Sequence, residues 1–392
     1  MKVCFETFGC RLNKAEALQM EADYLAMGWE VTKAHSDANL FVVRGCSVTA
    51  RAQYECEKLI SHLKRHYPNA GIKVCGCIES NDSTPFSTPQ PSQPSQLSQP
   101  SQPVPTRTAR AYLKVQDGCA GNCTFCIVPK FRGPSRSERF TDLLDQAKRF
   151  IDAGYHEIVV TGCNLALYAS NGKQLPDLAA TLAELCDGCR IRLGSVEPGP
   201  CALETIHAMA EHANICRFLH LPVQSGSKAV LLAMRRPYVV DDIDEAAGLA
   251  STLMPGIGLG CDLMAGFPGE TELDFAATKG ILKRLPFTNA HIFPFSRRPG
   301  TLATGFPRQI PRAIRSVRAR NLAETIRSKR IEFARSFVGK TVEIVVEDEK
   351  SGRGWTGEYL PCEPIGESPA RKSIVRVFVT KTKDDLLIGR AQ

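Results

Sequence analysis

Between residues 108 and 337 the chain alternates six times between a short apolar strand pattern and an amphipathic helical pattern. Repeated alternation of this kind predicts an α/β fold in which parallel strands are connected by helices. Six units predict a partial (β/α)6 barrel whose site lies at the carboxyl ends of the strands. The expected strands span residues 111–115, 157–161, 190–196, 217–221, 258–265 and 289–295, and the expected helices 141–153, 177–186, 202–213, 241–253 and 271–285.

The first 80 residues show a shorter version of the same alternation. Strand patterns at 2–8, 38–43 and 72–75 are separated by helical patterns at 14–27 and 48–66. This order predicts a small parallel α/β domain over residues 1–80.

Two further segments differ in character from these α/β regions. Residues 81–107 are dominated by a Pro-Ser-Gln repeat with almost no apolar side chains, which predicts an extended linker. Residues 338–392 carry four or five short strand patterns and predict a small antiparallel β barrel. The expected domains are therefore 1–80, 108–337 and 338–392, joined in part by the linker 81–107.

Composition limits the setting in which the protein works. No run of about 18 apolar residues is present, and the first twenty residues lack the basic and apolar regions of a signal peptide. We therefore expect a cytoplasmic protein without a membrane partner. In a reducing cytosol, 16 cysteines indicate metal ligands or reactive thiols rather than disulfides. A net charge of +8 favours a polyanionic partner such as nucleic acid.

The most specific motif is a C-x3-C-x2-C triplet directly after the first expected barrel strand. It comprises Cys119, Cys123 and Cys126. Three thiolates on one loop can ligate three corners of a four-iron cluster and leave the fourth iron open to a small molecule. A zinc site would need a fourth ligand at comparable spacing.

A second group of cysteines depends on the fold prediction. Each follows a glycine and lies just past one expected strand of the N-terminal domain; the pairs are Gly9–Cys10, Gly45–Cys46 and Gly76–Cys77. The carboxyl ends of parallel strands share one edge, so these thiols are expected to converge as a second cluster site. Taken singly, each cysteine fits a small buried apolar residue better than a cluster ligand.

The other cysteines are weaker candidates for a site. Cys186 and Cys189 form a C-x2-C pair that could bind zinc with Cys201 and Cys216, although free thiols are the simpler interpretation. A further set is expected to pack in the interior: Cys4, Cys56, Cys163, Cys261 and Cys362.

The motifs together resemble the radical S-adenosylmethionine methylthiotransferase family over nearly the whole chain outside the linker. In order they are TFGCRLNKAEA (7–17), GCSVTARA (45–52), GC (76–77), QDGCAGNCTFCIVPKFRGPSRS (116–137), TGCN (161–164), SVEP (195–198), HLPVQSGS (220–227), MRRPY (234–238), GFPGET (266–271) and FPFSRRPGT (293–301). The resemblance implies a radical S-adenosylmethionine barrel and a C-terminal TRAM domain, which binds RNA.

The resemblance also implies functional residues and cofactors. Cys119, Cys123 and Cys126 would hold the [4Fe-4S] cluster that cleaves S-adenosylmethionine, and Cys10, Cys46 and Cys77 a second, auxiliary [4Fe-4S] cluster that supplies or relays sulfur. Polar residues near the strand ends are candidates for positioning S-adenosylmethionine: Gly162, Asn164, Glu197, Gln224, Ser225 and Asp262. The short segment after Cys77, which begins Ile-Glu-Ser, departs from the family pattern and weakens the auxiliary-cluster prediction.

Within the family, TFGCRLN and the strand pattern HIFPFS at 291–296 most resemble the tRNA threonylcarbamoyladenosine branch. That branch adds a methylthio group to C2 of N6-threonylcarbamoyladenosine-37, next to the anticodon. The isopentenyladenosine branch and the ribosomal-protein S12 branch remain alternatives. An iron–sulfur RNA-binding protein without catalysis is the alternative from another class.

The expected partners follow from the resemblance and the charge pattern. They are tRNA, an electron donor such as flavodoxin or ferredoxin, and a sulfur donor of unknown identity. The motif GWTGEY at 354–359 resembles the TRAM signature, whose aromatic residues suit base stacking. The basic segment 312–337 adds either an RNA-binding surface or a merely solvated helix; its charged residues are Arg312, Arg315, Arg318, Arg320, Arg327, Lys329 and Arg330.

Overall fold

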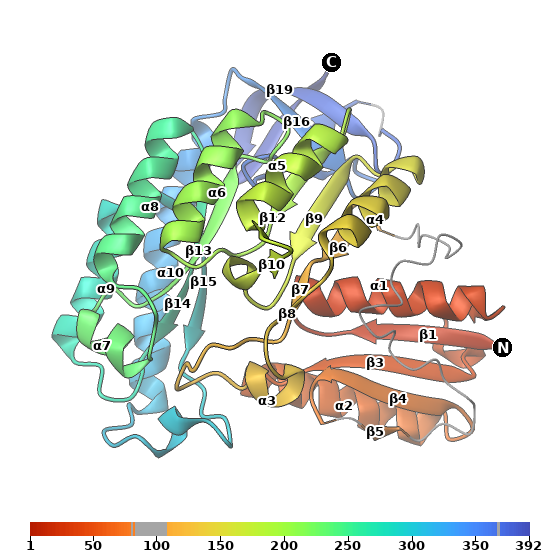
Figure 1. The fold of residues 1–392 in the computed structure, drawn as a ribbon, viewed down its shortest axis with the longest axis horizontal. Helices are drawn as coiled ribbons and strands as arrows, with labels where there is room; N and C mark the ends of the chain where they lie inside the picture. The colour runs from red at the N-terminus through yellow and green to blue at the C-terminus, as the bar shows by residue number, and fades with distance from the viewer. Residues whose placement is uncertain (80, 83–107, 367–368) are drawn as a thin grey trace.

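The computed structural model describes residues 1–79, 81–82, 108–366 and 369–392. Figure 1 shows an N-terminal α/β sheet beside a larger α/β barrel, with a small β barrel behind them. The predicted Pro-Ser-Gln linker lies outside the described residues except for Asn81–Asp82, which form the short strand β5. Within the described ranges, no helix combines the length and the apolar character that crossing a bilayer requires.

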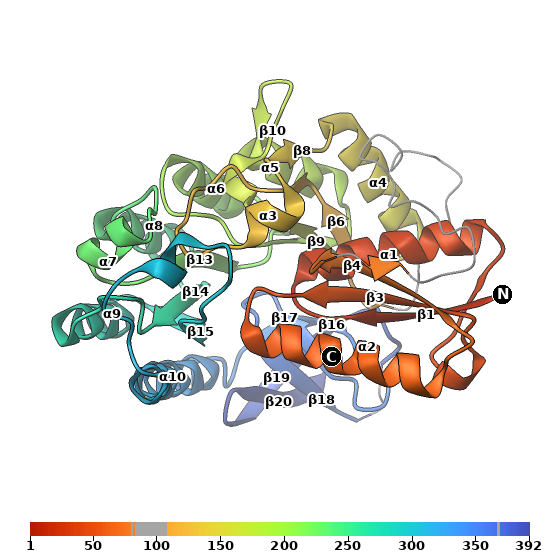
Figure 2. The same ribbon diagram turned by 90° about the horizontal axis from the view of Figure 1, so that it is seen from below.

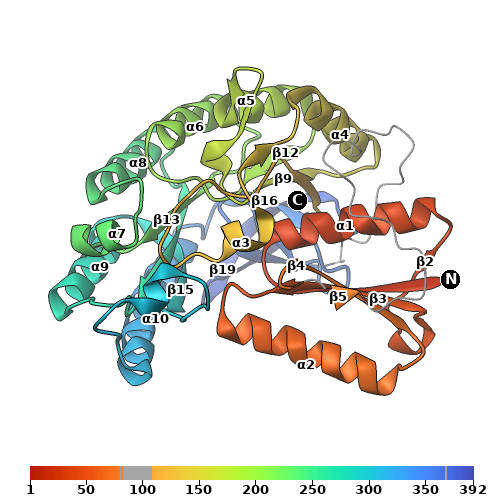
Figure 3. The same ribbon diagram turned by 60° about the horizontal axis from the view of Figure 1, so that its bottom comes forward.

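The N-terminal sheet has the strand order β2-β1-β3-β4-β5, parallel except for β5. Two helices, α1 and α2, cover its opposite faces (Figure 3). Each face has its own apolar core, one around Tyr24 of α1 and one around Leu63 of α2. The bounds are β1 Lys2–Thr7, α1 Arg11–Ala26, β2 Glu30–Val31, β3 Leu40–Cys46, α2 Ala50–His66 and β4 Gly71–Cys77.

Two strands of the N-terminal sheet extend further than the sequence predicted, beyond the expected ends at residues 43 and 75. β3 and β4 continue in register through Gly45–Gly76 to Cys46–Cys77, so these two cysteines are the last residues of their strands. The pairing continues because neither glycine carries a side chain. A Cβ at Gly76 would lie 2.7 Å from the carbonyl oxygen of Gly45.

The central barrel is open and parallel, as predicted. Strands β6, β9 and β12 form one half and β13, β14 and β15 the other. Two parallel bridges, Ile191 with Ile215 and Ser195 with His220, join the halves. The strands are β6 Ala111–Lys114, β9 Glu157–Thr161, β12 Arg190–Leu193, β13 Phe218–Gln224, β14 Gly258–Ala265 and β15 Phe287–Pro294.

The outer helices form an arc around this barrel (Figure 2). Their limits follow local sequence signals: at α9, Thr271 and Asp274 cap each other reciprocally. The helices are α4 Phe140–Asp152, α5 Leu175–Leu185, α6 Pro200–Glu211, α7 Lys228–Ala233, α8 Val240–Leu253 and α9 Glu272–Arg284. Helix α7 was not expected, because six residues are too few to show a helical period.

Short elements fill the loops of the barrel. Strand β7 pairs with β8, and β10 pairs with β11, both antiparallel. These elements and two 3-10 turns are β7 Gln116–Asp117, α3 Val128–Arg132, β8 Arg136–Ser137, β10 Ala169–Ser170, β11 Lys173–Gln174, η3 Leu165–Leu167 and η4 Leu302–Gly305; another 3-10 turn, η1 His35–Asp37, lies between β2 and β3 of the N-terminal domain.

The C-terminal strands close into a five-stranded barrel of order β16-β17-β18-β20-β19. Its pairing is antiparallel, as expected, except that β18 and β20 are parallel. The long helix α10, Arg312–Arg335, precedes it and packs along β15. The strands are β16 Thr341–Val346, β17 Gly354–Thr356, β18 Pro361–Ile365, β19 Ile374–Lys383 and β20 Leu386–Ala391.

Much of the positive charge of α10 is used inside the protein. Arg318 is buried and pairs with Glu270 at 2.5 Å, and Lys329 donates to the carbonyl oxygen of Leu282 at 2.6 Å. Arg330 pairs with Asp385 of the C-terminal barrel at 2.6 Å. The exposed cations of α10 are Arg312, Arg320, Arg327 and Arg335, and of these Arg327 pairs with Asp384 at 3.4 Å.

A buried carboxylate joins the two barrels. Glu157, the first residue of β9, is fully buried and accepts hydrogen bonds from Arg190 at 2.6 Å and Arg192 at 2.7 Å. Burial would raise the pKa of Glu157, but the guanidinium groups of Arg192 and Arg190 outweigh it and lower the pKa below its ordinary range. Glu157 is therefore ionised at neutral pH.

The same arginines donate to the backbone of the C-terminal barrel. Arg190 reaches the carbonyl oxygen of Glu343 at 3.0 Å, and Arg192 reaches that of Thr356 at 2.8 Å. Glu157 thus holds the side chains that dock the C-terminal barrel onto the central one.

We expect Glu157→Ala to destabilise the protein by about 3–5 kcal/mol, because it leaves buried guanidinium groups without their counter-charge. Thermal unfolding should show a lower midpoint, and limited proteolysis should release the C-terminal barrel. Glu324→Ala, at an exposed position on α10, is the matched control. Equal midpoints for the two variants would contradict the role given to Glu157.

Candidate functional site

The first cysteine triplet lies on the loop between β7 and α3, at the carboxyl end of β6. The loop depends on Gly118, whose φ is +66° and whose Cβ would lie 2.0 Å from the carbonyl oxygen of Pro134. At Gly121 the backbone N–H donates to Cys119 Sγ at 3.2 Å. A Cβ at Gly121 would lie 3.1 Å from that sulfur and 3.8 Å from Cys123 Sγ, so both sulfurs face this glycine.

Partial burial changes the protonation of the thiols in the first triplet. Burial raises the pKa of Cys126 to about 12 and also raises that of Cys123, where Arg236 opposes it. All three thiols of the triplet lie close enough to influence one another electrostatically. None of the three is fully buried.

The second triplet lies at the carboxyl edge of the N-terminal sheet. Cys46 and Cys77 are paired neighbours on β3 and β4, and Cys10 interacts electrostatically with both. Gly9 has a φ of +91°, and a Cβ there would lie 3.0 Å from Cys46 Sγ. The structure therefore brings together three thiols that are far apart in the chain. Burial raises the pKa of Cys46 and of Cys77.

The spacing of the sulfurs suits a cluster better than a single ion. Among the described residues, neither triplet has its three sulfurs all within 4.8 Å of one another. A zinc ion with Zn–S bonds of about 2.3 Å cannot span sulfurs more than about 4.6 Å apart. Iron–sulfur clusters are held by sets of cysteine sulfurs such as these.

The zinc alternative at the C-x2-C pair finds no comparable support. Cys186 and Cys189 hydrogen-bond to each other, and Cys216 lies near Cys189. In the described part of the chain these cysteines belong to no convergent group of three ligands. Free buried thiols remain the interpretation.

One cysteine of each triplet lines a cavity of about 560 Å³. Cys10 and Cys126 line it from the N-terminal sheet and the barrel, and Tyr359 lines it from the C-terminal barrel. Three of the residues expected to position S-adenosylmethionine also line it: Gly162, Gln224 and Asp262. Gln224 holds a φ of +63°, a left-handed conformation that is uncommon for residues other than glycine.

Ser225 does not reach this cavity. It is fully buried, and its hydroxyl group hydrogen-bonds to Thr278 Oγ1 at 3.2 Å and accepts from the backbone N–H of Ser227 at 3.2 Å. It stabilises the turn between β13 and α7.

Asn164 and Glu197 form part of a hydrogen-bonded chain that ends at the first triplet. Asn164 Nδ2 donates to Glu197 Oε2 at 2.8 Å, and Arg236 pairs with the other oxygen of Glu197. Arg236 Nη1 in turn donates to Cys123 Sγ at 3.0 Å. Arg236 occurs in the MRRPY motif, but no sequence spacing indicated that it contacts a cysteine.

A second group that sequence reasoning did not identify lies across β13, β14 and β15. His220 Nε2 and His291 Nδ1 each lie 3.1 Å from Asp262 Oδ1. Burial would raise the pKa of Asp262, but the two histidines outweigh it and lower the pKa. All three side chains line the shared cavity, so its wall there is polar and contains an ionised carboxylate.

Tyr359 of the TRAM-like motif is stacked against other rings of the protein. Tyr359 stacks on Trp355 with ring centroids 4.7 Å apart and on Phe218 of the central barrel at 4.8 Å. Arg11, next to Cys10, lies 5.2 Å from the Tyr359 ring. The expectation that these rings bind RNA is wrong for Tyr359, because its faces are occupied by protein.

Comparison with known proteins agrees with this arrangement. Residues 113–280 match the Radical SAM superfamily, and residues 2–93 match the uncharacterized protein family UPF0004. The tRNA-2-methylthio-N(6)-dimethylallyladenosine synthase of Mycobacterium ulcerans (strain Agy99) is 31% identical, over 98% of this chain and 82% of that protein. The chain belongs to the radical S-adenosylmethionine methylthiotransferase family. It is therefore a radical S-adenosylmethionine enzyme, whose family implies a [4Fe-4S] cluster and S-adenosylmethionine.

Other relatives carry different substrate names. The Threonylcarbamoyladenosine tRNA methylthiotransferase MtaB of Bacillus subtilis (strain 168) is 29% identical, over 97% of this chain and 94% of that protein. Among solved structures, the radical S-adenosylmethionine methyltransferase TsrM of Kitasatospora setae has a TM-score of 0.56 and 14% identity over 77% of each chain, a likeness of fold. These relatives agree on the family but differ in their substrates, so the substrate of this enzyme has to be argued from the residues of the site.

We expect Gly76→Ala to disturb the second triplet, since its Cβ would collide with the Gly45 carbonyl group at a φ of +103°. Reconstituted protein should bind about four iron atoms per chain instead of about eight. Gly28→Ala is the matched control, because Gly28 also has a positive φ, +78°, but no atom within 4 Å of its Cβ position. Equal iron contents in the two variants would refute the prediction.

Proposed function

We propose that this enzyme is a tRNA methylthiotransferase that modifies C2 of N6-threonylcarbamoyladenosine-37, next to the anticodon. The observation that carries the proposal is the cavity that Cys10 of one triplet and Cys126 of the other both line. In this reaction C2 of the adenine loses a hydrogen atom and gains sulfur. The groups that perform these two steps therefore need access to the same position of the substrate.

The cysteines are assigned to two cofactors. Cys119, Cys123 and Cys126 hold the family's [4Fe-4S] cluster, and the second triplet, Cys10, Cys46 and Cys77, holds an auxiliary cluster. When bound, these groups supply the electron that cleaves S-adenosylmethionine and the sulfur that is transferred.

The remaining residues prepare the cavity. Gly162 leaves room beside the first triplet, because any side chain there would press on Gln116, whose Oε1 would lie 3.0 Å from its Cβ. Gln224 and Asp262 provide polar groups for S-adenosylmethionine or the adenine. Arg236 orients Cys123 and is itself held by Glu197. Residues of all three parts of the chain line this cavity.

The polar wall favours the threonylcarbamoyl branch over the isopentenyl branch. A threonylcarbamoyl substituent carries a hydroxyl group and N–H groups that can donate to acceptors in this wall, whereas an isopentenyl substituent is wholly apolar. Asp262 is ionised and can only accept, so His291 Nδ1 donates the hydrogen bond between them. The other ring nitrogen of His291, Nε2, faces away from Asp262. A wall of His220, Asp262 and His291 would leave an isopentenyl group beside polar groups that it cannot pair.

The anticodon arm is proposed to dock on the outer face of the C-terminal barrel. There β19 exposes Phe378 beside Arg376, and Arg390 of β20 is paired with Phe378. An exposed aromatic ring between cations is suited to a nucleic-acid backbone with unstacked bases. Electrons would come from a small donor such as flavodoxin or ferredoxin; the sulfur donor is unassigned.

Nucleoside mass spectrometry of tRNA tests the proposal. In cells lacking this gene, the wild-type gene should restore 2-methylthio-N6-threonylcarbamoyladenosine, and neither Cys119→Ala nor the triple alanine variant of Cys10, Cys46 and Cys77 should do so. Purified triple variant should still cleave S-adenosylmethionine to 5′-deoxyadenosine, whereas Cys119→Ala should not.

Other outcomes would redirect the assignment. Restoration of a methylthio group on isopentenyladenosine, or on ribosomal protein S12, would indicate those branches. Absence of S-adenosylmethionine cleavage by the reduced wild-type protein would indicate an iron–sulfur RNA-binding protein.

The branch assignment also predicts the effect of His291→Leu. With an anticodon stem-loop carrying threonylcarbamoyladenosine, kcat/KM should fall about 10-fold or more, the loss expected when a buried polar contact is removed. His207→Leu, at an exposed position on α6, should leave it unchanged. An unchanged kcat/KM for His291→Leu would argue against the polar wall as the feature that selects the substrate. An increase in kcat/KM that is the same for every substrate would argue against it as well.

A further inference from the structure

The last residue of α3, Arg132, has an unusually complete set of partners. It lies six residues after Cys126, and its side chain is only 5% exposed. A guanidinium group has five N–H donors, and here each has an acceptor within 3.0 Å. The acceptors are Cys77 Sγ at 2.9 Å, Glu16 Oε1 at 3.0 Å, Asp117 Oδ1 at 2.9 Å, Asn13 Oδ1 at 2.7 Å and Glu16 Oε2 at 3.0 Å.

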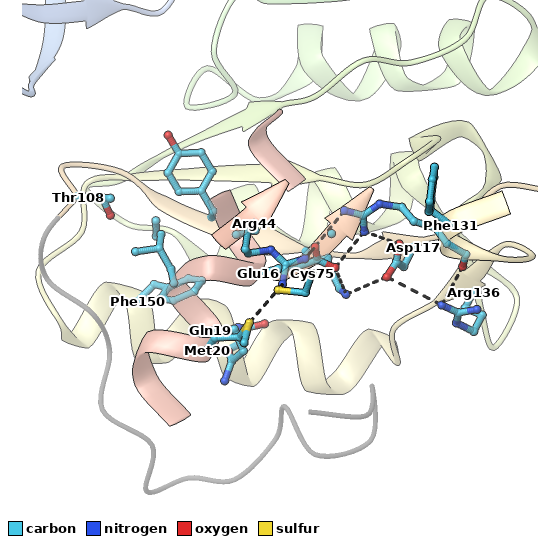
Figure 4. A pocket seen from close by; sticks show the side chains of 18 of the residues that line it. Glu16, Gln19, Met20, Arg44, Cys75, Thr108, Asp117, Phe131, Arg136 and Phe150 are labelled. Atoms are coloured by element: carbon cyan, nitrogen blue, oxygen red, sulfur yellow. Dashed lines mark hydrogen bonds and ion pairs between the residues drawn. The ribbon is translucent and has the colours of Figure 1, made fainter. Parts of the chain in front are cut away.

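These acceptors come from both halves of the site. Asp117 lies two residues before Cys119, on the loop of the first triplet. Asn13 and Glu16 lie on α1, and Cys77 belongs to the second triplet. Figure 4 shows Glu16 and Asp117 in one chain of ion pairs beside a pocket of about 400 Å³. Arg132 therefore connects the segments that carry the two triplets.

Asn13 extends this connection to the other two cysteines of the second triplet. Its Nδ2 donates to the carbonyl oxygen of Phe8 at 2.8 Å and to that of Gly45 at 2.9 Å. Phe8 and Gly45 lie two residues and one residue before Cys10 and Cys46. All three strand ends are thus tied, directly or through Asn13, to Arg132.

The contact with Cys77 also has an electrostatic consequence. Arg132 Nε donates to Cys77 Sγ at 2.9 Å, so a positive charge and an N–H donor lie directly beside this sulfur. A hydrogen bond to a cluster-ligating sulfur stabilises the more negative, reduced state of the cluster and so raises its reduction potential.

We propose that Arg132 is a positioning residue that sets the placement of the auxiliary site relative to the first triplet and raises the reduction potential of the auxiliary cluster through Cys77. The inference rests on the proposed function, because it assumes that the second triplet holds a cluster. Glu16 and Asp117 hold Arg132, and Arg132 holds Cys77.

The test isolates the auxiliary cluster. Full-length protein with Cys119, Cys123 and Cys126 all replaced by alanine is reconstituted with iron and sulfide, and its cluster is titrated by EPR-monitored potentiometry. Arg132→Lys, which keeps the charge but loses most of the donors, and Arg132→Gln, which loses the charge, are compared in that background. Arg136→Lys is the matched control: Arg136 lies near Asp117, at 3.9 Å, but makes no described contact with a cysteine sulfur.

We expect both Arg132 variants to shift the midpoint potential to more negative values, with a larger shift for Arg132→Gln, and Arg136→Lys to leave it unchanged. Loss of iron from the Arg132 variants with an unchanged circular-dichroism spectrum would equally support the positioning role. Unchanged potential and iron content would overturn the inference, as would loss of iron together with loss of the folded spectrum, which indicates a purely structural residue. Absence of any cluster in the parent triple variant would instead refute the auxiliary-cluster assignment itself.

Discussion

The docking of α1 against the edge of the open barrel is the contact on which the site depends. A six-stranded barrel leaves a gap between β6 and β15, and the N-terminal sheet lies at that gap. Ala15 and Leu18 of α1 pack with Tyr112 and Val159 of the barrel in a small apolar core. Without this contact the second triplet would lie on a separate domain, and the two triplets would not each contribute a cysteine to one cavity.

Charge, rather than apolar area, determines how the three parts are oriented. A buried carboxylate surrounded by arginines occurs at both interfaces: Glu157 where the C-terminal barrel docks, and Glu16 where the N-terminal sheet docks. Burying ions is costly unless every partner is in place, so such groups contribute little net stability but tolerate few alternative arrangements. An enzyme that removes hydrogen from a carbon atom and adds sulfur to the same atom needs its two cysteine triplets to be placed precisely relative to each other.

Much of the fold and part of the site could be predicted from the sequence. The strand–helix alternation identified the barrel, with β9 and β14 matching the expected strands residue for residue. The glycine–cysteine pairs at the strand ends indicated a convergence that the register of β3 and β4 explains. The roles of Arg132, Arg236 and His220 could not be predicted, because an isolated polar residue has no periodicity and the partners Cys77, Cys123 and Asp262 are more than 40 residues away. The RNA-stacking role expected for Tyr359 was wrong, because the sequence does not show whether an aromatic residue lies at an interface or on the surface.

The sequence by itself determined the class of chemistry and the order of the elements. Both depend on local signals: the spacing of Cys119, Cys123 and Cys126 within one loop, and the periods of strands and helices. Only the tertiary structure decided that one cavity is lined by a cysteine of each triplet, that its wall carries a histidine–aspartate group, and that the TRAM-like aromatic residues close an interface. Those features depend on which strand ends and side chains meet across long stretches of chain, which packing and buried charge decide.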